Sequence, residues 1–180
     1  MNILNNGIEL LFPTPIYYIT IGGSRLQNIQ NEMEKVYSRL KWECPESWQK
    51  SQKLSNDSGE LFEENYIEKY KMIFFEEFLN EQLENYCNYL NFNFDKNCVI
   101  KTWFSKFENG DFGHIHNHLP ADISGCYYFK TQGDDGKIYF EDAKPYKFLS
   151  ETGRWEHEPV EGKMLLFPSW LKHGEIGRAH

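Results

Sequence analysis

The spacing of apolar residues changes once along this chain, near residue 95, and that change constrains the fold more than any other feature of the sequence. Before it, apolar residues recur at helical spacing in two segments, 24–40 and 62–90. After it, short apolar runs alternate with turn residues, a pattern typical of antiparallel strands in a sandwich or barrel. The sequence therefore predicts an α+β, mainly β protein, with helices first, a jelly-roll-like β unit after them, and the helices packed on one sheet.

Local patterns on either side of this change predict the individual elements. A β-prone segment covers 10–19, and its two prolines suit an edge strand more than a central one. The predicted helices carry too wide an apolar face to stand alone, so we expect a single domain over 1–180, with a strand and helical support region over 1–95 and a jelly-roll core holding the functional site over 96–180. The strands predicted in the second half are Val99–Phe107, Ile123–Lys130, Lys137–Phe140 and Lys163–Phe167.

Composition and charge argue against a disordered chain, a nucleic-acid partner and a membrane span. Aromatic residues make up 17% of the 180 residues, too many for a disordered chain. The net charge of −8 and the lack of a basic run argue against a nucleic-acid partner, and no apolar run is long enough for a membrane span. The first residues lack the features of a secretory signal and the four cysteines form no CxxC pair, so the sequence predicts reduced thiols and a cytoplasmic location. None of these features indicates an oligomeric state.

A cluster of histidines is the strongest chemical signal in the sequence. His114, His116 and His118 alternate with other residues, so on a strand they would project to one side. Imidazole suits zinc, copper, iron and nickel, and a site with catalytic use needs a third ligand from elsewhere and open positions for substrate. His173 lies just past the predicted strand 163–167 and is the natural candidate.

Spacing alone leaves two interpretations of this cluster open. Histidine-rich turns also occur on protein surfaces, so the His-x-His pattern by itself favours a metal site and a solvated turn equally. His114 follows a glycine at the start of the predicted strand and can be exposed. His157 lies between two glutamates, where we expect it to be solvated. Cys126 falls in the middle of a predicted strand, where a buried, inert thiol is expected.

Three longer blocks extend the pattern around the histidines. Within Trp103–Phe129, the His116-Asn117-His118 triplet is followed, after five residues, by Ser-Gly-Cys-Tyr-Tyr. The other blocks are Pro159–His173, which ends in Phe-Pro-Ser-Trp-Leu-Lys-His, and Leu-Phe-Pro-Thr-Pro at Leu11–Pro15. Together they resemble the family of Fe(II)/2-oxoglutarate-dependent oxygenases found in marine bacteria and their phages. The resemblance covers most of the chain.

The resemblance implies the double-stranded β-helix (jelly-roll) of the prolyl-hydroxylase-like oxygenases. It places the metal on His116, His118 and His173, with His114 as an additional candidate ligand. It also implies Fe(II) as cofactor, 2-oxoglutarate as co-substrate, and O2 and an unknown prime substrate as partners. The wider superfamily has a carboxylate at the position of His118, and three neutral imidazoles leave another divalent metal open as the occupant.

A cation for the co-substrate is less well defined. In the family, a basic residue about ten positions past the distal histidine pairs with the far carboxylate of 2-oxoglutarate. Arg178 lies five residues after His173, which on one continuous strand places it on the opposite face unless a turn or bulge intervenes. The other candidate cations are Lys163, Lys172 and Arg154, the last in an expected loop.

Two neighbouring tyrosines are further candidates for co-substrate binding. Tyr127 and Tyr128 lie on the predicted strand that faces the metal, and either can donate a hydrogen bond to 2-oxoglutarate. Strand alternation allows only one of them to do so.

The expected function is therefore that of an Fe(II)- and 2-oxoglutarate-dependent dioxygenase hydroxylating an unknown substrate, with no catalytic residues beyond the metal ligands. If a phage encodes the chain, the expected location is the host cytoplasm. The alternative is a non-catalytic or non-oxygenase metal-binding jelly-roll protein of cupin-like type. Absence of a carboxylate ligand favours the alternative, and retention of the histidine blocks favours the oxygenase.

Overall fold

The computed structural model describes residues 13–45, 52–57, 59, 62–96, 98–133, 135–141 and 154–176. Its helices are α1 (Gly23–Tyr37), α2 (Tyr66–Tyr70) and α3 (Ile73–Tyr89). Its strands are β1 (Tyr17–Thr20), β2 (Trp42–Glu43), β3 (Lys53–Ser55), β4 (Ser105–Lys106), β5 (Phe112–His116), β6 (Ile123–Tyr128), β7 (Ile138–Glu141), β8 (Arg154–His157), β9 (Lys163–Pro168) and β10 (His173–Ile176).

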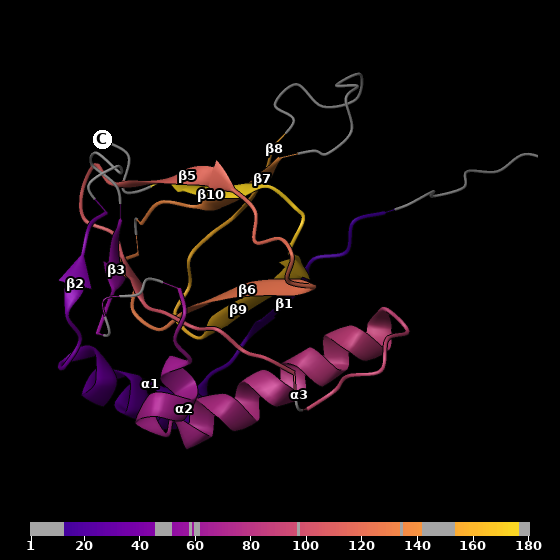
Figure 1. Cartoon of the computed structure of the whole chain (residues 1–180), viewed down its shortest axis with the longest axis horizontal. Helices are drawn as coiled ribbons and strands as arrows, with labels where there is room; N and C mark the ends of the chain where they lie inside the picture. Colours follow the sequence, from indigo (N-terminus) through magenta and orange to yellow (C-terminus); the bar gives the residue numbers. More distant parts are fainter. Residues whose placement is uncertain are drawn as a thin grey trace, which may run out of the picture.

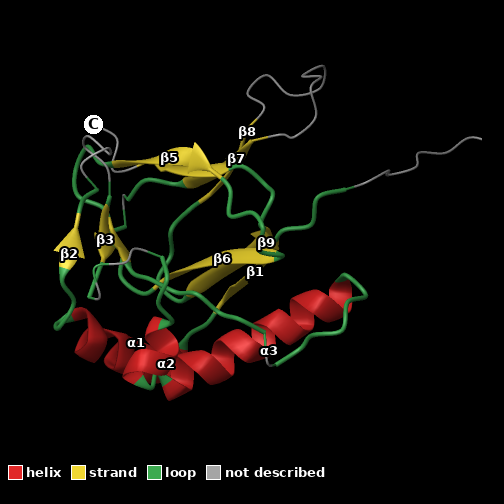
Figure 2. Ribbon diagram, in the orientation of Figure 1, coloured by secondary structure: helices red, strands yellow, loops and turns green. Residues whose placement is uncertain are grey.

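The strands form three sheets in which all paired strands are antiparallel. Their strand orders are β1-β9-β6, β5-β10-β7-β8 and β2-β3-β4. The first two sheets lie one above the other, with the third to one side (Figure 1), and the helices gather below the β1-β9-β6 sheet (Figure 2). The expected α+β, mainly β architecture with two antiparallel sheets is confirmed, whereas the small third sheet was not predicted.

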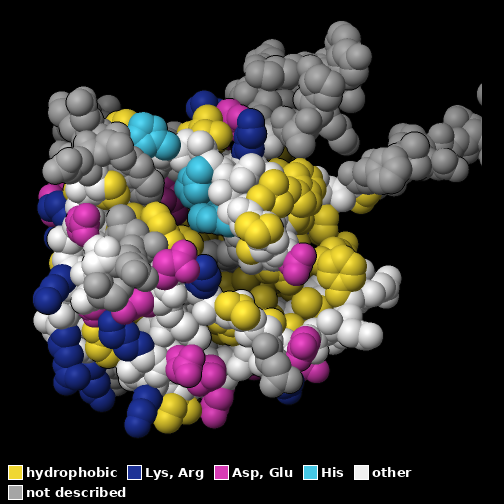
Figure 3. Space-filling view, viewed as in Figure 1, with side chains coloured by type: hydrophobic (Ala, Val, Ile, Leu, Met, Phe, Trp, Pro, Cys, Tyr) yellow, Lys and Arg dark blue, Asp and Glu magenta, His cyan; other side chains and the backbone are white. Residues whose placement is uncertain are grey.

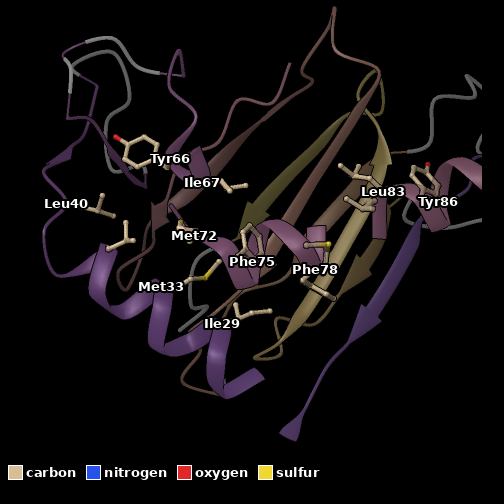
Figure 4. Packing of buried hydrophobic residues seen from close by; sticks show 13 residues of the cluster. Ile29, Met33, Leu40, Tyr66, Ile67, Met72, Phe75, Phe78, Leu83 and Tyr86 are labelled. Atoms are coloured by element: carbon tan, nitrogen blue, oxygen red, sulfur yellow. The ribbon is translucent and has the colours of Figure 1, made fainter. Parts of the chain in front are cut away.

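The helices are fixed on the β1-β9-β6 sheet by a shared apolar cluster. Ile29 of α1 and Phe78 of α3 are fully buried in it, together with Met164 and Leu166 of β9. Side chains of both helices point into the space between helix and sheet (Figure 4). Removing this surface from water is what holds the helices in place, and the predicted packing of helices on one sheet is confirmed.

Strand β9 is buried on both faces. Met164 and Leu166 belong to the helix-side cluster, whereas Leu165 and Phe167 belong to a second cluster that includes Phe140 of β7. Burial on both sides explains why this strand is a continuous apolar run in the sequence. The second cluster lies between the two larger sheets and forms the interior against which the histidines are placed.

The prediction of one long helix over 62–90 is wrong, because this segment forms α2 and α3. Lys71 adopts a φ of 53° in the left-handed region and ends α2. The side chain of Asn65 caps α2 by accepting hydrogen bonds from two backbone N–H groups of its first turn. Within the described residues, no helix has the length and apolar character needed to cross a bilayer.

The first backbone N–H groups of α3 find their hydrogen-bond acceptor on another helix, α1. Glu32 of α1 accepts hydrogen bonds from the backbone N–H groups of Phe74 and Phe75, at 3.2 and 2.9 Å. The first N–H groups of a helix have no partner within it, so this carboxylate supplies one and complements the positive end of the helix. The predicted helix over 24–40 is confirmed as α1, which ends at Tyr37.

The predicted strand Val99–Phe107 is also wrong over most of its length, since only β4 belongs to a sheet. The hydroxyl of Thr102 accepts a hydrogen bond from the backbone N–H of Tyr66, and the N–H of Thr102 donates to the carbonyl of Glu64. The segment is therefore tied to the start of α2. Ile100, Trp103 and Phe104 pack on the helix-side cluster, whereas Val99 is exposed, so the apolar residues do not alternate between two faces of a sheet.

Candidate metal centre

Strand pairing brings three histidines together. His116 is the last residue of β5, and β10 pairs with β5 so that His173 lies directly opposite His116. His118 follows two residues later, where its backbone N–H donates to the carbonyl of Ser169 at 3.0 Å. One ligand atom from each of the three rings lies within 4.8 Å of the other two. This separation allows three imidazoles to bind one metal ion from one side.

Backbone carbonyls orient two of these rings. Nδ1 of His116 lies 2.6 Å from the carbonyl oxygen of His114, and Nδ1 of His173 lies 3.0 Å from that of Leu171. A carbonyl oxygen only accepts, so each Nδ1 carries the proton. The unprotonated Nε2 is then available as the ligand atom, an arrangement common to histidines that bind metals in proteins.

Burial keeps two of the imidazoles neutral. It lowers the pKa of both His118 and His173 to about 4, with a smaller contribution from the neighbouring histidines. His173 is only 4% exposed. Neutral imidazole is the form that binds metal, so the site is ready for a cation at neutral pH without prior loss of protons from these rings.

These lowered pKa values predict an acid-sensitive metal-free protein. An unfolded histidine titrates near pH 6.5, so between pH 6.5 and 4 the unfolded chain binds protons that the folded chain excludes, and stability falls as the pH falls. For His173 we expect a loss of about 1–2 kcal/mol between pH 7 and 5, measured by urea unfolding in EDTA. His173→Gln should show a shallower pH dependence than the parent, and equal slopes would contradict the prediction.

Aromatic and hydroxyl side chains surround the histidines. The Trp103 ring lies 5.6 Å from that of His118, and the Phe167 ring lies 4.8 Å from that of His173. The hydroxyls of Ser124 and Ser169 hydrogen-bond to each other at 2.7 Å. On the molecular surface, histidine side chains lie next to a patch of hydrophobic side chains (Figure 3). The centre thus combines an apolar wall with an accessible side.

Two other histidines in the described part of the chain lie outside the cluster. His114 is exposed and packs near Phe112. The register between β10 and β5 shifts after the pair His173 and His116, so that Glu175 pairs with Gly113 and His114 lies in the irregular stretch between the two pairs. The prediction that His157 is solvated is wrong: it is half-buried on β8, with its ring 5.8 Å from that of Tyr18.

The two tyrosines point to opposite faces of β6. Tyr127 packs on the helix-side cluster, with its ring 5.1 Å from that of Phe75. Tyr128 joins the cluster between the sheets, where Cys126 is also packed as a half-buried thiol whose pKa is raised to about 12, mainly by desolvation. Both tyrosine hydroxyls are buried; that of Tyr127 has no hydrogen-bond partner among the described residues, whereas that of Tyr128 lies beside the thiol of Cys126, a weak acceptor. Only Tyr128 shares the interior with His173.

The candidate cations occupy different places. Lys163 pairs with Tyr128 across β9 and β6, and its ammonium group donates to the carbonyl of Glu158 at 2.8 Å. Lys172 is exposed. Arg154 starts β8 and is not in a loop as expected; its guanidinium lies over the ring of Tyr139. Arg178 lies outside the described residues.

Sequence reasoning missed a half-buried acid near these groups. Glu175 lies two residues after His173 on β10, so their side chains project to the same side of the strand. Burial raises the pKa of Glu175 to about 7, and its charge adds to burial in raising the pKa of Tyr128 and Cys126. The carboxyl group therefore faces the interior. Alternation from His173 predicts only which side of β10 carries Glu175, and whether that side is covered depends on the neighbouring strands.

Comparison with known proteins supports the sequence-based resemblance. Residues 101–178, which include all three histidines, match a family model described as "Putative 2OG-Fe(II) oxygenase". Among solved structures, the chain is similar to the crystal structure of a prolyl-4-hydroxylase from Pseudomonas putida, with 14% identity and a TM-score of 0.55 over 93% of this chain and 87% of that chain. At this identity the likeness concerns the fold. A search of curated proteins finds no match. The family resemblance is confirmed, and a marine or phage origin stays a prediction.

Proposed function

We propose that this chain, whose residues 101–178 match the 2OG-Fe(II) oxygenase family, is an Fe(II)- and 2-oxoglutarate-dependent dioxygenase that hydroxylates an unknown substrate. The observation that carries the proposal is the cluster of His116, His118 and His173, in which backbone carbonyls already orient two of the rings. Ligand orientation before binding lowers the entropic cost of holding the ion.

The described residues fit a divalent ion. Three imidazoles on one side of the site leave other coordination positions for O2 and a co-substrate. Fe(II) bound there would supply oxidative hydroxylation coupled to conversion of 2-oxoglutarate to succinate and CO2. Trp103 and Phe167 would exclude water from two sides of the histidine cluster. Since no carboxylate joins the cluster in the described part of the chain, zinc or nickel is the alternative occupant.

The proposal includes the architecture around the site. We propose that the sheets β1-β9-β6 and β5-β10-β7-β8 are the two sheets of a double-stranded β-helix and that the chain forms one domain. The apolar cluster between the sheets and the fold similarity to a prolyl-4-hydroxylase support this. A cytoplasmic location, in a bacterial host if a phage encodes the chain, stays a prediction.

Tyr128 is the residue best placed to hold the co-substrate. A dicarboxylate that enters the interior loses its hydration and needs new hydrogen bonds, and the Tyr128 hydroxyl is a buried donor whose side-chain neighbour in the described residues is the thiol of Cys126, a weak hydrogen-bond acceptor. Lys163, opposite Tyr128, and Arg178 are the proposed cations for the far carboxylate.

Replacing Tyr128 with phenylalanine should weaken binding of 2-oxoglutarate to the metal-loaded protein by about tenfold or more, the effect of one hydrogen bond to a charged group. Titration calorimetry measures the change. Tyr127→Phe is the matched control, because this neighbouring hydroxyl is also buried but lies on the helix side of β6. Equal effects of the two substitutions would remove Tyr128 from the site.

One assay tests the proposed activity directly. Purified protein is loaded with Fe(II) under anaerobic conditions, exposed to O2 and 2-oxoglutarate without a prime substrate, and succinate is quantified. We expect slow succinate formation that depends on Fe(II) and is absent from His116→Ala. A protein that binds Fe(II) stoichiometrically yet neither binds 2-oxoglutarate nor forms succinate would contradict the proposal.

Glu175 favours the second candidate function, a metal-binding jelly-roll without oxygenase activity. Its inward carboxyl group lies near Tyr128, and when ionised it would repel a dicarboxylate entering the same space. Glu175→Gln separates the candidates, since this change removes the charge and keeps the shape. Binding of 2-oxoglutarate that appears only in this variant would favour the non-oxygenase function for the parent.

A further inference from the structure

A groove on the helical side of the molecule carries a local excess of positive charge. It lies between α1 and the junction of α2 with α3, has a volume of about 350 Å³, and is lined by Asn28, Asn31, Glu32, Lys35, Val36, Arg39, Tyr70, Lys71 and Phe74. The whole chain has a net charge of −8. Three basic side chains around one groove therefore stand out against the charge of the protein.

The basic residues of the groove differ from most others in the structure. Within the described residues, Lys35, Arg39 and Lys71 have no ion pair with a carboxylate. By contrast, ion pairs are formed by Arg25, Lys53, Lys69, Lys101, Lys106, Lys130 and Lys137. Positive charges that stay unpaired beside each other raise the local potential and attract anions.

The one acidic side chain among the lining residues is already engaged. Glu32 accepts hydrogen bonds from the backbone N–H groups of Phe74 and Phe75 at the start of α3. Its charge is thus directed to the positive end of a 17-residue helix. Lys35 is in the last turn of α1, where a cation also complements the helix dipole, but that role does not account for Arg39 or Lys71.

The groove also offers an apolar surface next to the cations. Phe74 is 50% exposed, although it follows directly after the start of a helix whose neighbouring aromatic residues are buried. The ring of Tyr70 and the side chain of Val36 line the same groove. An exposed aromatic face beside Lys and Arg suits a ligand that has both a charged group and a planar body.

We propose that this groove binds a small organic phosphate. Lys35, Arg39 and Lys71 hold the phosphate groups, with Asn28 and Asn31 as hydrogen-bond donors, and the body of the ligand packs on Phe74. The proposal does not depend on the metal centre or on the proposed oxygenase activity.

Titration calorimetry on metal-free protein in EDTA tests it, so that no metal ion at the histidines can bind the probe. The probes are inorganic pyrophosphate, which carries charge alone, and adenosine 5′-diphosphate, which adds a planar body. We expect both to bind, the nucleotide more tightly, and we expect the double substitution Lys35→Ala and Arg39→Ala to weaken both by about tenfold or more. Phe74→Ala should remove the preference for the nucleotide and leave pyrophosphate binding unchanged.

The control is the double substitution Lys101→Ala and Lys137→Ala. It removes the same charge from exposed residues that are ion-paired elsewhere, and we expect affinities within about twofold of the parent. If neither probe binds at a concentration of ~10 mM, any dissociation constant is larger than that of a specific site, and the proposal is overturned. Equal losses in the two double variants would also overturn it, and a nucleotide preference that survives Phe74→Ala would overturn the placement of the ligand body.

Discussion

Replacing His173 with alanine should abolish stoichiometric binding of Fe(II) and Zn(II). The remaining histidines, His116 and His118, come from one short segment and leave the ion without the ligand that closes the site from β10. Residues that only hydrogen-bond to metal ligands typically change metal affinity by about 10- to 100-fold when they are replaced. Loss of one of the three ligands should have a larger effect, a decrease in affinity of ~100-fold or more. Metal analysis after desalting, followed by competition with a chromophoric chelator, measures this.

His157→Ala is the control for this experiment. His157 is a half-buried histidine on β8 of the same sheet, but it packs on Tyr18 and lies outside the cluster of ligand atoms. Metal content should stay at the level of the parent. If both variants lost metal equally while keeping their thermal unfolding transitions, the ion would have to bind elsewhere.

Replacing Phe78 with alanine should destabilise the protein by about 3–5 kcal/mol, the usual cost of deleting a buried aromatic side chain. Phe78 is fully buried at the centre of the contact between α3 and the β1-β9-β6 sheet, with its ring 5.9 Å from that of Tyr127. Alanine removes apolar surface from both partners and leaves a cavity, because packed helices and sheets relax only in part. Equilibrium unfolding in urea measures the loss.

The matched substitution is Phe74→Ala, one turn earlier on the same helix. Phe74 is 50% exposed, so its replacement should cost less than ~1 kcal/mol. A comparable loss of stability in both variants would mean that the helix is held to the sheet by something other than the apolar cluster described above.

The helices show what could be predicted from sequence and what could not. In α1, Ile29, Met33 and Val36 repeat at helical spacing and are all buried, so the pattern directly predicted the buried face. The break between α2 and α3 depends on the backbone of Lys71 in the left-handed region, which glycine or asparagine occupies more often. A lysine there carries no local signal of a helix end.

The candidate site shows a similar division. His116, His118 and His173 were predictable because the first two are separated by a single residue and the third follows a strongly apolar strand. The inward position of Glu175 was not recognised, because it depends on β10 having a neighbour on each side, β5 and β7, and on the second sheet facing it. Which strands are neighbours is a property of the whole topology, and short-range patterns do not report it.

The position of β5 at the edge of its sheet has a consequence for how the metal acts on the protein. Among the described strands, β5 pairs only with β10, and an edge strand is held by one row of hydrogen bonds. His116 ends that edge strand and His173 begins its neighbour, so an ion bound by both histidines links β5 to β10. Its binding free energy then adds to the free energy that keeps the edge closed. A higher concentration of free metal should therefore lower the fraction of molecules in which β5 has separated from β10.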